Sequence, residues 1–469
     1  MNNDTKKGLS TSLRRFFGIG DAAFTLMTLV ENVYFNFFLT NIAMFNLGII
    51  TMIQTTTTAI DAATSWMYGA IMNGTKPMKW GRYRSWLLIT PWLVPLIYMM
   101  KYVVVGENQT IAAWIIIAAG VISSIIWNFG YVANMALIAV VGKTPAERAQ
   151  LSASRGTYNR AATMLFSYMG LPLANLLAMI VTEQYKFAAL AFVFAVMAAI
   201  GYNIHFKLTE GYEELPKDAA LEGKEAVKKE KTSAGAMFKA LFANTHLIFL
   251  LVAEFTRWST NFIVSGCAVY YFTYVAQNMA LLPTYLLITS ILCTAGAYTS
   301  KYLAVKMGTK QAFVFSFLLF GACLVTARLC YTSTWAVIGL MALGQYGYGC
   351  IYSLSAPMFA DASIYAEYKT GENSSGWIMG LGNVPLKVAL IVRGLIINGV
   401  LIAAGFSAQT AVEATTIAVK EAIANIFLLI PGAGLIAGGL LILFGFRLTR
   451  ETVEQMSSEI ELRKIKINN

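Results

Sequence analysis

The chain has 469 residues, of which 57% are hydrophobic and only 13% charged, and its formal net charge is +11. A soluble domain carries about 25% charged residues. The composition therefore excludes a soluble globular enzyme and predicts an all-α polytopic membrane protein. The five cysteines lie in apolar runs without a CxxC pair, so we expect no metal centre, disulfide framework or cofactor.

Apolar runs long enough to span a bilayer, about 20 residues, recur along the chain. The first follows a basic N-terminal segment and lacks a small-residue cleavage site, which predicts a retained helix rather than a signal peptide. No strand is expected, because helices satisfy their own backbone hydrogen bonds in lipid. We predict twelve transmembrane helices, at residues 17–40, 44–73, 84–104, 110–140, 157–181, 187–206, 245–275, 281–303, 311–331, 334–360, 378–405 and 421–447.

A long hydrophilic segment after the sixth predicted helix divides the chain six plus six. The turns MKWGRYRSW and VKMGTKQAF, after the second and eighth helices, each place a glycine among basic residues and suggest an internal repeat. Two six-helix halves with a site between them are the design of a major facilitator transporter. The predicted parts are an N-terminal half at 1–206, a cytoplasmic central loop at 207–244, a C-terminal half at 245–448 and a cytoplasmic, amphipathic tail at 449–469.

The basic residues gather on one side of this topology. With the N-terminus in the cytoplasm, the outer loops receive only Lys101, Lys186 and Lys420. This positive-inside bias predicts a multi-pass protein of the cell membrane with both termini cytoplasmic. The net charge then reflects topology and attraction to anionic lipid, so we expect no nucleic-acid partner, and we expect a monomer.

Four motifs resemble those of the glycoside–pentoside–hexuronide:cation symporter family, the melibiose-permease branch of the major facilitator superfamily. They are FGIGDAAF with FFLTN, DAATSWMYGAIMNGT with KWGRYRSW, ERAQLSASR, and ADASIYAEYKTG. The resemblance covers nearly the whole chain. It implies import of a sugar or glycoside by alternating access, coupled to Na⁺ or H⁺. Within the first motif, we expect Asp21 to anchor the start of its helix rather than to touch sugar.

The cation site that the resemblance implies is incomplete in this chain. Asp61 matches the first acid of the family's site, but Ser65 and Trp66 replace the second acid and the proline after it. Asp61 and Ser65 are four residues apart and share one helix face. Three alternatives stay open: Na⁺ bound at Asp61 and Ser65, a proton carried by Asp61, or an Asp61–Lys387 ion pair without coupling. No other metal site is predicted.

The sugar site differs from that of melibiose permease. Thr25 and Tyr131 stand where that protein has sugar-binding aspartates, whereas Lys387 matches its lysine. The intramembrane charges are mostly positive and favour an anionic sugar, such as a uronide or a sulfonated sugar. Arg257 could hold such an anion, or pair with Glu254 one turn away. Further candidate sugar contacts are Glu31, Asn32, Tyr34, Asn128, Asn134, Trp258, Asn261, Gln345, Tyr346 and Tyr348.

An enzyme is less consistent with the sequence than a transporter. A membrane-embedded enzyme would need a catalytic acid, histidine or metal cluster at one membrane face, and the sequence shows none, so no enzyme is expected. The sequence is also compatible with an uncoupled facilitator or a non-transporting sensor of the same fold.

The turns predicted on the cytoplasmic side carry candidate gating residues. They are Arg82, Arg84, Glu367 and Lys369.

Overall fold

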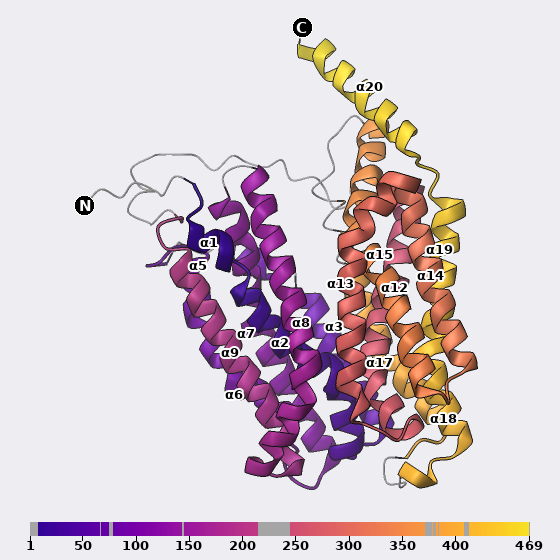
Figure 1. The fold of residues 1–469 in the computed structure, drawn as a ribbon. Coiled ribbons are helices and arrows are strands. Elements are labelled where there is room, and N and C mark those ends of the chain that lie inside the picture. Colours follow the sequence, from indigo (N-terminus) through magenta and orange to yellow (C-terminus); the bar gives the residue numbers. More distant parts are fainter. Residues whose placement is uncertain are drawn as a thin grey trace. The chain divides into compact units, whose positions relative to one another are not determined.

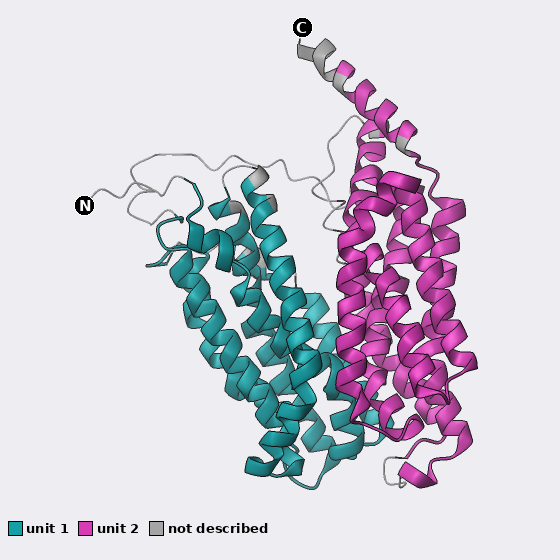
Figure 2. Ribbon diagram, viewed as in Figure 1, with its two compact units in different colours: residues 1–228 teal, residues 229–469 magenta. Residues whose placement is uncertain are grey.

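The computed structural model describes residues 8–65, 67–74, 78–142, 145–213, 244–370, 378, 381–382, 384–407 and 412–468. Trp66 lies outside the described residues. Within these ranges the chain is helical and contains no strand (Figure 1). It forms two compact units, Met1–Lys228 (unit 1) and Lys229–Asn469 (unit 2), coloured teal and magenta in Figure 2.

Unit 1 is a bundle in which α2 packs against α8 and α9. In the same unit α3 packs against α7, and α6 packs against α7 and α9. Its elements are α1 (Thr11–Phe16), α2 (Ile19–Phe37), η1 (Phe38–Ile42), α3 (Leu47–Thr64), α4 (Met67–Gly74), α5 (Arg84–Ile89), η2 (Pro91–Leu93), α6 (Val94–Met100), α7 (Gln109–Val141), α8 (Pro145–Val181), η3 (Glu183–Tyr185) and α9 (Lys186–Leu208).

Unit 2 repeats these packing relations with its own helices. Here α12 packs against α17 and α19, α13 packs against α15, and α14 packs against α15 and α19. Its elements are α12 (Thr245–Tyr270), η4 (Tyr271–Val275), α13 (Leu281–Met307), α14 (Thr309–Leu329), α15 (Thr334–Thr370), α17 (Val384–Ala403), η5 (Val412–Ala414), α18 (Ile417–Ala424), η6 (Asn425–Leu429), α19 (Ile430–Gly445) and α20 (Arg450–Asn468).

The first long helix of each unit ends in the same way. α2 continues into the π-helix η1 and α12 into the π-helix η4. Two residues after each π-helix the backbone adopts a positive φ, 53° at Met44 and 51° at Gln277. The glycines of the two predicted repeat turns, Gly81 and Gly308, also have positive φ, which a residue with a Cβ rarely adopts. The internal repeat is therefore present in backbone geometry.

Nine helices in the described part of the chain are long and apolar enough to cross a membrane. They include helices at Thr11–Ile42, Gln109–Ile138 and Thr245–Val275. Three predicted spans, at 44–73, 84–104 and 334–360, do not meet this criterion, although each region is helical. The number of twelve transmembrane helices therefore stays a prediction.

Local sequence explains why two of these three spans are weaker. Pro91 and Pro95 lack a backbone N–H donor, and they divide the third predicted span into α5, η2 and α6. In the span predicted at 44–73, α3 ends at Thr64 and α4 begins at Met67. The run of threonines in α3 lowers its hydropathy, because the hydroxyl groups are polar. Thr55 and Thr57 satisfy their hydroxyls by donating to carbonyls of the same helix.

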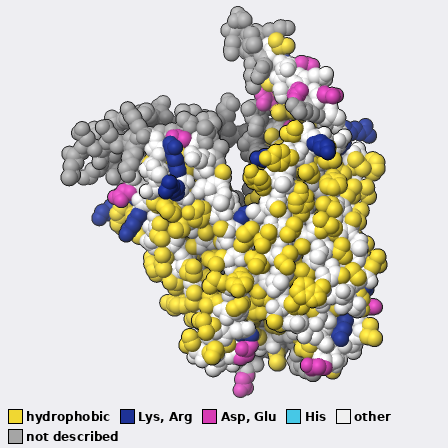
Figure 3. All heavy atoms as spheres, in the orientation of Figure 1, with side chains coloured by type: hydrophobic (Ala, Val, Ile, Leu, Met, Phe, Trp, Pro, Cys, Tyr) yellow, Lys and Arg dark blue, Asp and Glu magenta, His cyan; other side chains and the backbone are white. Residues whose placement is uncertain are grey.

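The surface is that of a protein in lipid. On the face shown in Figure 3, hydrophobic side chains cover the middle, and charged side chains gather toward the ends. Several of the most exposed residues are large and apolar, including Met179, Val305 and Leu329, each more than 80% exposed. Water would penalise such a surface, whereas hydrocarbon does not.

The predicted amphipathic tail forms the helix α20. It packs on α15, where Arg463 donates to the carbonyl oxygen of Tyr368 at 3.0 Å and lies over its ring. The tail is therefore attached to the end of α15 that carries the ADASIYAEYKTG motif.

Candidate functional site

The Asp61 carboxylate is held between two helices of unit 1. Its Oδ1 accepts hydrogen bonds from Ser124 Oγ at 2.6 Å and Asn128 Nδ2 at 2.8 Å, both on α7. Ser124 and Asn128 are four residues apart and so face α3 together. Asn128 also donates to the carbonyl of Ser124, which fixes its amide. An acid inside a bilayer costs about 2.5–3.5 kcal/mol on insertion scales, and these donors offset part of that cost.

The residues that follow Asp61 bond mainly within their own segment. Thr64 Oγ1 lies 2.8 Å from the hydroxyl of Tyr68 on α4. The hydroxyl of Ser65 donates to the carbonyl of Ala62 at 2.9 Å. Ser65 was expected to share the cation site with Asp61, and its observed partner lies on the backbone of α3. Its coupling role stays a prediction.

The oxygen atoms around Asp61 define what the site can do. A carboxylate, the Ser124 hydroxyl and the Asn128 amide lie within one hydrogen-bonded group. The Asp61 carboxylate and the Ser124 hydroxyl are side-chain oxygens of the kind that bind a small hard cation. The same arrangement could hold a protonated acid that donates to a neighbouring oxygen. The geometry is compatible with either coupling ion.

The remaining candidates in unit 1 lie along α2 and α7. Thr25 Oγ1 donates to Asn159 Oδ1 on α8 at 2.9 Å. The ring of Tyr131 stacks on Phe24, with centroids 5.1 Å apart. Asn134 is fully buried, and its amide has no hydrogen-bond partner among the described residues. Asn32 is half-buried on α2.

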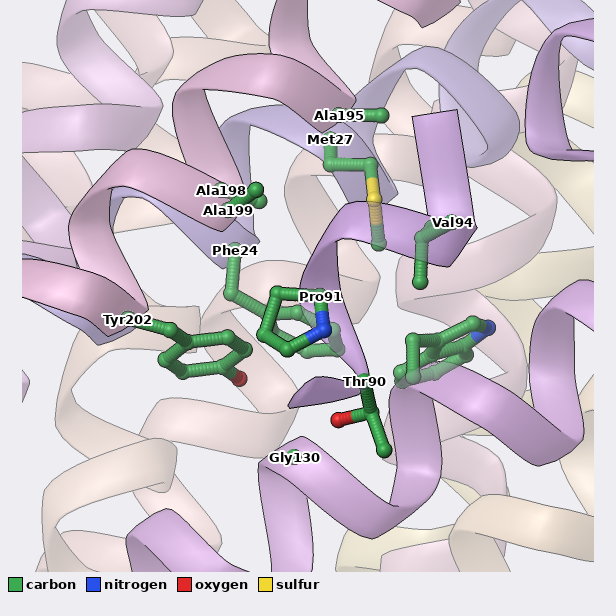
Figure 4. A pocket seen from close by; sticks show the side chains of 11 residues that line it. Phe24, Met27, Thr90, Pro91, Val94, Gly130, Ala195, Ala198, Ala199 and Tyr202 are labelled. Atoms are coloured by element: carbon green, nitrogen blue, oxygen red, sulfur yellow. The ribbon is translucent and has the colours of Figure 1, made fainter. Parts of the chain in front are cut away.

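A small cavity lies among α2, α7 and α9 of unit 1 (Figure 4). Phe24, Pro91 and Tyr202 line it with mostly apolar atoms. Its volume of about 10 Å³ has room for about one water molecule. The cavity is too small to be a sugar site.

A buried ion pair joins two of the family-like motifs. Asp21, from FGIGDAAF, accepts from Nε of Arg155, from ERAQLSASR, at 2.7 Å, and a second guanidinium N–H also bonds the carboxylate. Both side chains are buried. Asp21 stands in the first turn of α2, as expected of a residue that anchors the helix start. Its partner on α8 was not predicted.

The KWGRYRSW turn is fastened to the end of α9. The Glu213 carboxylate accepts from the backbone N–H groups of Tyr83 and Arg84 at 2.9 and 3.0 Å. A Cβ on Gly81 would lie 2.5 Å from this carboxylate, so the close approach requires glycine. The Arg84 guanidinium is buried and donates to the carbonyl of Phe206 at 2.8 Å. Its proposed gating role is untested by these contacts.

The charged pair of unit 2 lies within one helix. Nε and Nη2 of Arg257 donate to Oε2 of Glu254 at 2.9 and 2.5 Å, and both residues are at most 3% exposed. Arg257 lies over the Trp258 ring, 4.2 Å from its centroid. The structure thus shows Arg257 paired with Glu254 one turn away. Glu254 Oε1 has no partner among the described residues.

Close helix packing positions the aromatic candidates of α15. A Cβ on Gly296 would lie 1.9 Å from the Tyr346 carbonyl oxygen, so the backbones of α13 and α15 touch there. Across this contact Thr299 Oγ1 donates to the hydroxyl of Tyr346 at 2.8 Å. Gln345, and Asn261 on α12, are half-buried.

The other predicted residues fall on described segments as well. Lys387 is half-buried on α17. Lys369 is exposed near the end of α15, with its ammonium 5.1 Å from the Tyr365 ring centroid. Arg82 and Glu367 are half-exposed. These positions neither establish nor remove their expected roles.

A family model described as MFS/sugar transport protein matches residues 16–450. The chain belongs to this family. YagG of Escherichia coli (strain K12), named as a candidate glycoside/cation symporter, is 21% identical over 95% of this chain and 93% of its own length. A candidate sulfoquinovose importer of the same strain is 24% identical over 96% and 93%. The isoprimeverose transporter of Lactiplantibacillus pentosus is 22% identical over 92% and 88%.

The fold is also found among solved structures. The crystal structure of nucleoside transporter NupG matches with a TM-score of 0.61 at 13% identity and covers 94% of this chain and 100% of that one. Together these comparisons confirm the predicted family resemblance and a helical major-facilitator fold. The protein is a multi-pass membrane transporter of the sugar-transport type.

Sequence reasoning missed four residues that contact the motifs. Ser124 is a small polar residue in an apolar helix, and Asn159 is one of several polar residues near the start of α8. Arg155 lies in a recognised motif but was not assigned a partner. Glu213 is one of several acids near the central loop. The i,i+4 spacing of Ser124 and Asn128 was the one available signal.

Proposed function

We propose that this protein imports a sugar or glycoside by alternating access, in symport with H⁺ or Na⁺, and that Asp61 couples the cation to the sugar. The observation that carries this proposal is the Asp61 carboxylate bonded to Ser124 and Asn128. An acid on a membrane helix is costly, and the half-buried Asp61 carboxylate lies beside the Ser124 hydroxyl and the Asn128 amide. Ser65, at the next position on the same face, completes the proposed coupling site.

The architecture that we propose has twelve transmembrane helices in two six-helix halves. The N-terminal half is 1–206, the central loop 207–244, the C-terminal half 245–448 and the tail 449–469, with both termini cytoplasmic. The helix contacts and π-helices that recur in the two units support this architecture. We propose a monomer in contact with lipid and with no enzymatic activity.

The proposed sugar contacts lie in both units. Thr25, Tyr131 and Trp258 represent the polar and aromatic groups that bind sugars, and Lys387 is the proposed contact for an anionic group. Because Glu254 already neutralises the charge of Arg257, we propose Lys387, rather than Arg257, as the main contact for the anionic group of the sugar. The other proposed contacts are Asn32, Asn134, Arg257, Asn261, Gln345 and Tyr346, and the proposed gating residues are Arg82, Arg84, Glu367 and Lys369.

The relatives point to two substrate classes. Sulfoquinovose, imported by one candidate relative, carries a sulfonate, whereas isoprimeverose, transported by another, is a neutral glycoside. We propose a glycoside as the substrate, with a uronide or sulfonated sugar as its anionic form.

Counterflow in proteoliposomes tests the function. Vesicles preloaded with an unlabelled uronide, sulfosugar or neutral glycoside are diluted into the same labelled sugar without an ion gradient. A transporter gives a transient overshoot of label inside the vesicles, and protein-free vesicles give none. Absence of overshoot for all three sugar classes contradicts transport and leaves a sensor role. Overshoot without any effect of an imposed H⁺ or Na⁺ gradient on uptake identifies an uncoupled facilitator.

A further inference from the structure

A second charged cluster of unit 1 lies close to Asp61. The ammonium of Lys101 is 2.5 Å from Oε1 of Glu31 on α2. It also lies over the rings of Phe35 and Tyr98, 4.3 and 5.9 Å from their centroids. Only 3% of the Lys101 side chain is exposed. A lysine at the outer end of a membrane helix normally extends toward water, but this one turns into the bundle.

The Lys101 side chain reaches the crossing of α3 and α7. A Cβ built on Gly120 of α7 would lie 3.6 Å from Cε of Lys101 and 3.0 Å from the methyl group of Thr57 on α3. Gly120, Thr57 and Lys101 therefore meet at one point. A Cβ at Gly120 would be in ordinary contact with the lysine stem and tight against Thr57, so the lysine packs directly against the place where the two helices meet.

Asp61 lies one helical turn along the same crossing. It follows Thr57 by four residues on α3, and its donor Ser124 follows Gly120 by four residues on α7. Four residues correspond to about 6 Å along a helix axis. Two acids, Glu31 and Asp61, thus share the neighbourhood of one tethered cation.

Two phenols also face this cluster in the described part of the chain. Tyr68 of α4 interacts with Asp61 and Tyr98 of α6 with Glu31. Phenols are uncharged at neutral pH. These two groups therefore add no charge to that of Glu31, Lys101 and Asp61.

We propose that Lys101 determines ion specificity: its ammonium supplies the positive charge that a metal cation would bring to these acids, and it selects against Na⁺ at Asp61. This inference rests on the proposed coupling role of Asp61. Like charges about one turn apart repel strongly where little water screens them. Glu31, an oxygen ligand that Na⁺ could otherwise use, is already bound to the ammonium. Of the two coupling ions considered above, the proton then remains.

Sodium binding to the purified full-length protein tests this inference without any sugar. The probe is ²²Na⁺ retained by the protein in detergent, titrated with NaCl against choline chloride at constant ionic strength. We expect no saturable ²²Na⁺ binding to the wild type. Lys101→Met leaves two acids without their cation and should gain saturable binding, with an affinity at least about tenfold above that of any other form tested.

Four further variants control for charge and folding. Lys101→Arg keeps the cation and should bind no Na⁺, as should Glu31→Gln, in which the ammonium faces Asp61 alone. Lys101→Met with Asp61→Asn should lose the gained site. Removing one partner of a buried pair destabilises a fold, so Glu31→Gln with Lys101→Met removes both charges. This double variant, which keeps the Asp61 carboxylate, should bind Na⁺ more weakly than Lys101→Met but measurably.

Two results would overturn the inference. One is saturable Na⁺ binding to the wild type that disappears in Asp61→Asn. The other is a folded, monodisperse Glu31→Gln, Lys101→Met variant that binds no Na⁺. Either result leaves the coupling role of Asp61 intact, because that role is judged by gradient-driven sugar uptake. Conversely, absence of counterflow contradicts the proposed function without bearing on which ion the protein binds.

Discussion

The two units have the same helix contacts but arrange their charges differently. In unit 1, the acids are held between helices: Asp61 by α7, Asp21 by Arg155 of α8, and Glu31 by Lys101 beyond α6. In unit 2, the Glu254–Arg257 pair forms within a single turn of α12. A contact between helices changes when the helices move, whereas a contact within one helix travels with it. The acids of unit 1 are therefore better placed to link ion binding to conformational change.

The strongest test of this contrast is Asp61→Asn. The amide keeps the shape of the side chain but cannot carry the charge change that coupling requires, so gradient-driven accumulation should fall to the background of protein-free vesicles. Exchange of labelled sugar without a gradient should persist. Glu107→Gln, in the exposed loop between α6 and α7, is the matched control and should accumulate sugar normally. Uphill uptake by Asp61→Asn at the wild-type level would refute the coupling role.

Breaking the unit 2 pair should affect stability rather than coupling. Arg257→Met leaves Glu254 charged, buried and unpaired, which costs about 3–5 kcal/mol. Thermal unfolding in detergent should show a large loss of stability. Glu254→Gln combined with Arg257→Met removes both charges and should recover most of it. Lys306→Met, at an exposed position of α13, is the control. Equal losses in the single and double variants would contradict a self-satisfied pair.

Lys387 tests whether unit 2 contributes a charge to sugar recognition. Lys387→Ala should weaken binding of p-nitrophenyl β-D-glucuronide by about tenfold, about 1.4 kcal/mol, because the carboxylate loses its cation. Binding of the matched neutral glucoside should change little. Lys420→Ala, on α18, serves as the control. If the affinities for the two sugars fall equally, Lys387 does not recognise the anionic group, and unit 2 has a purely structural charge pair.

The smallest expected effect concerns the KWGRYRSW turn of unit 1. Glu213→Ala removes the acceptor of the Tyr83 and Arg84 N–H groups, and loss of a helix N-cap costs about 1 kcal/mol. A modest decrease in thermal stability should follow. Glu451→Ala, in the exposed tail helix, should have no such effect. An unchanged melting temperature in Glu213→Ala would show that the turn keeps its conformation without this carboxylate.

The sequence predicted the fold better than the site. Runs such as 110–140 and 187–206 are visible as long apolar segments, and α7 and α9 contain them. The span at 84–104 was predicted as one helix, but Pro91 and Pro95 divide it. The Glu254–Arg257 pair was anticipated as one of two possibilities because its spacing is local. Lys101, which the sequence placed on the outer side, is buried against Glu31, and the sequence did not predict this contact.

What the sequence determined by itself was the class of protein, its apolar helices and its family, and it singled out Asp61 as a candidate coupling residue. These follow from hydropathy and motifs, which are properties of neighbouring residues. Only the tertiary structure identified the partners of Asp61, because Ser124 and Asn128 lie 63 and 67 residues away along the chain. It likewise placed Lys101 beside Gly120 and Thr57. Packing decides which polar faces of separate helices meet, and no local pattern encodes that choice.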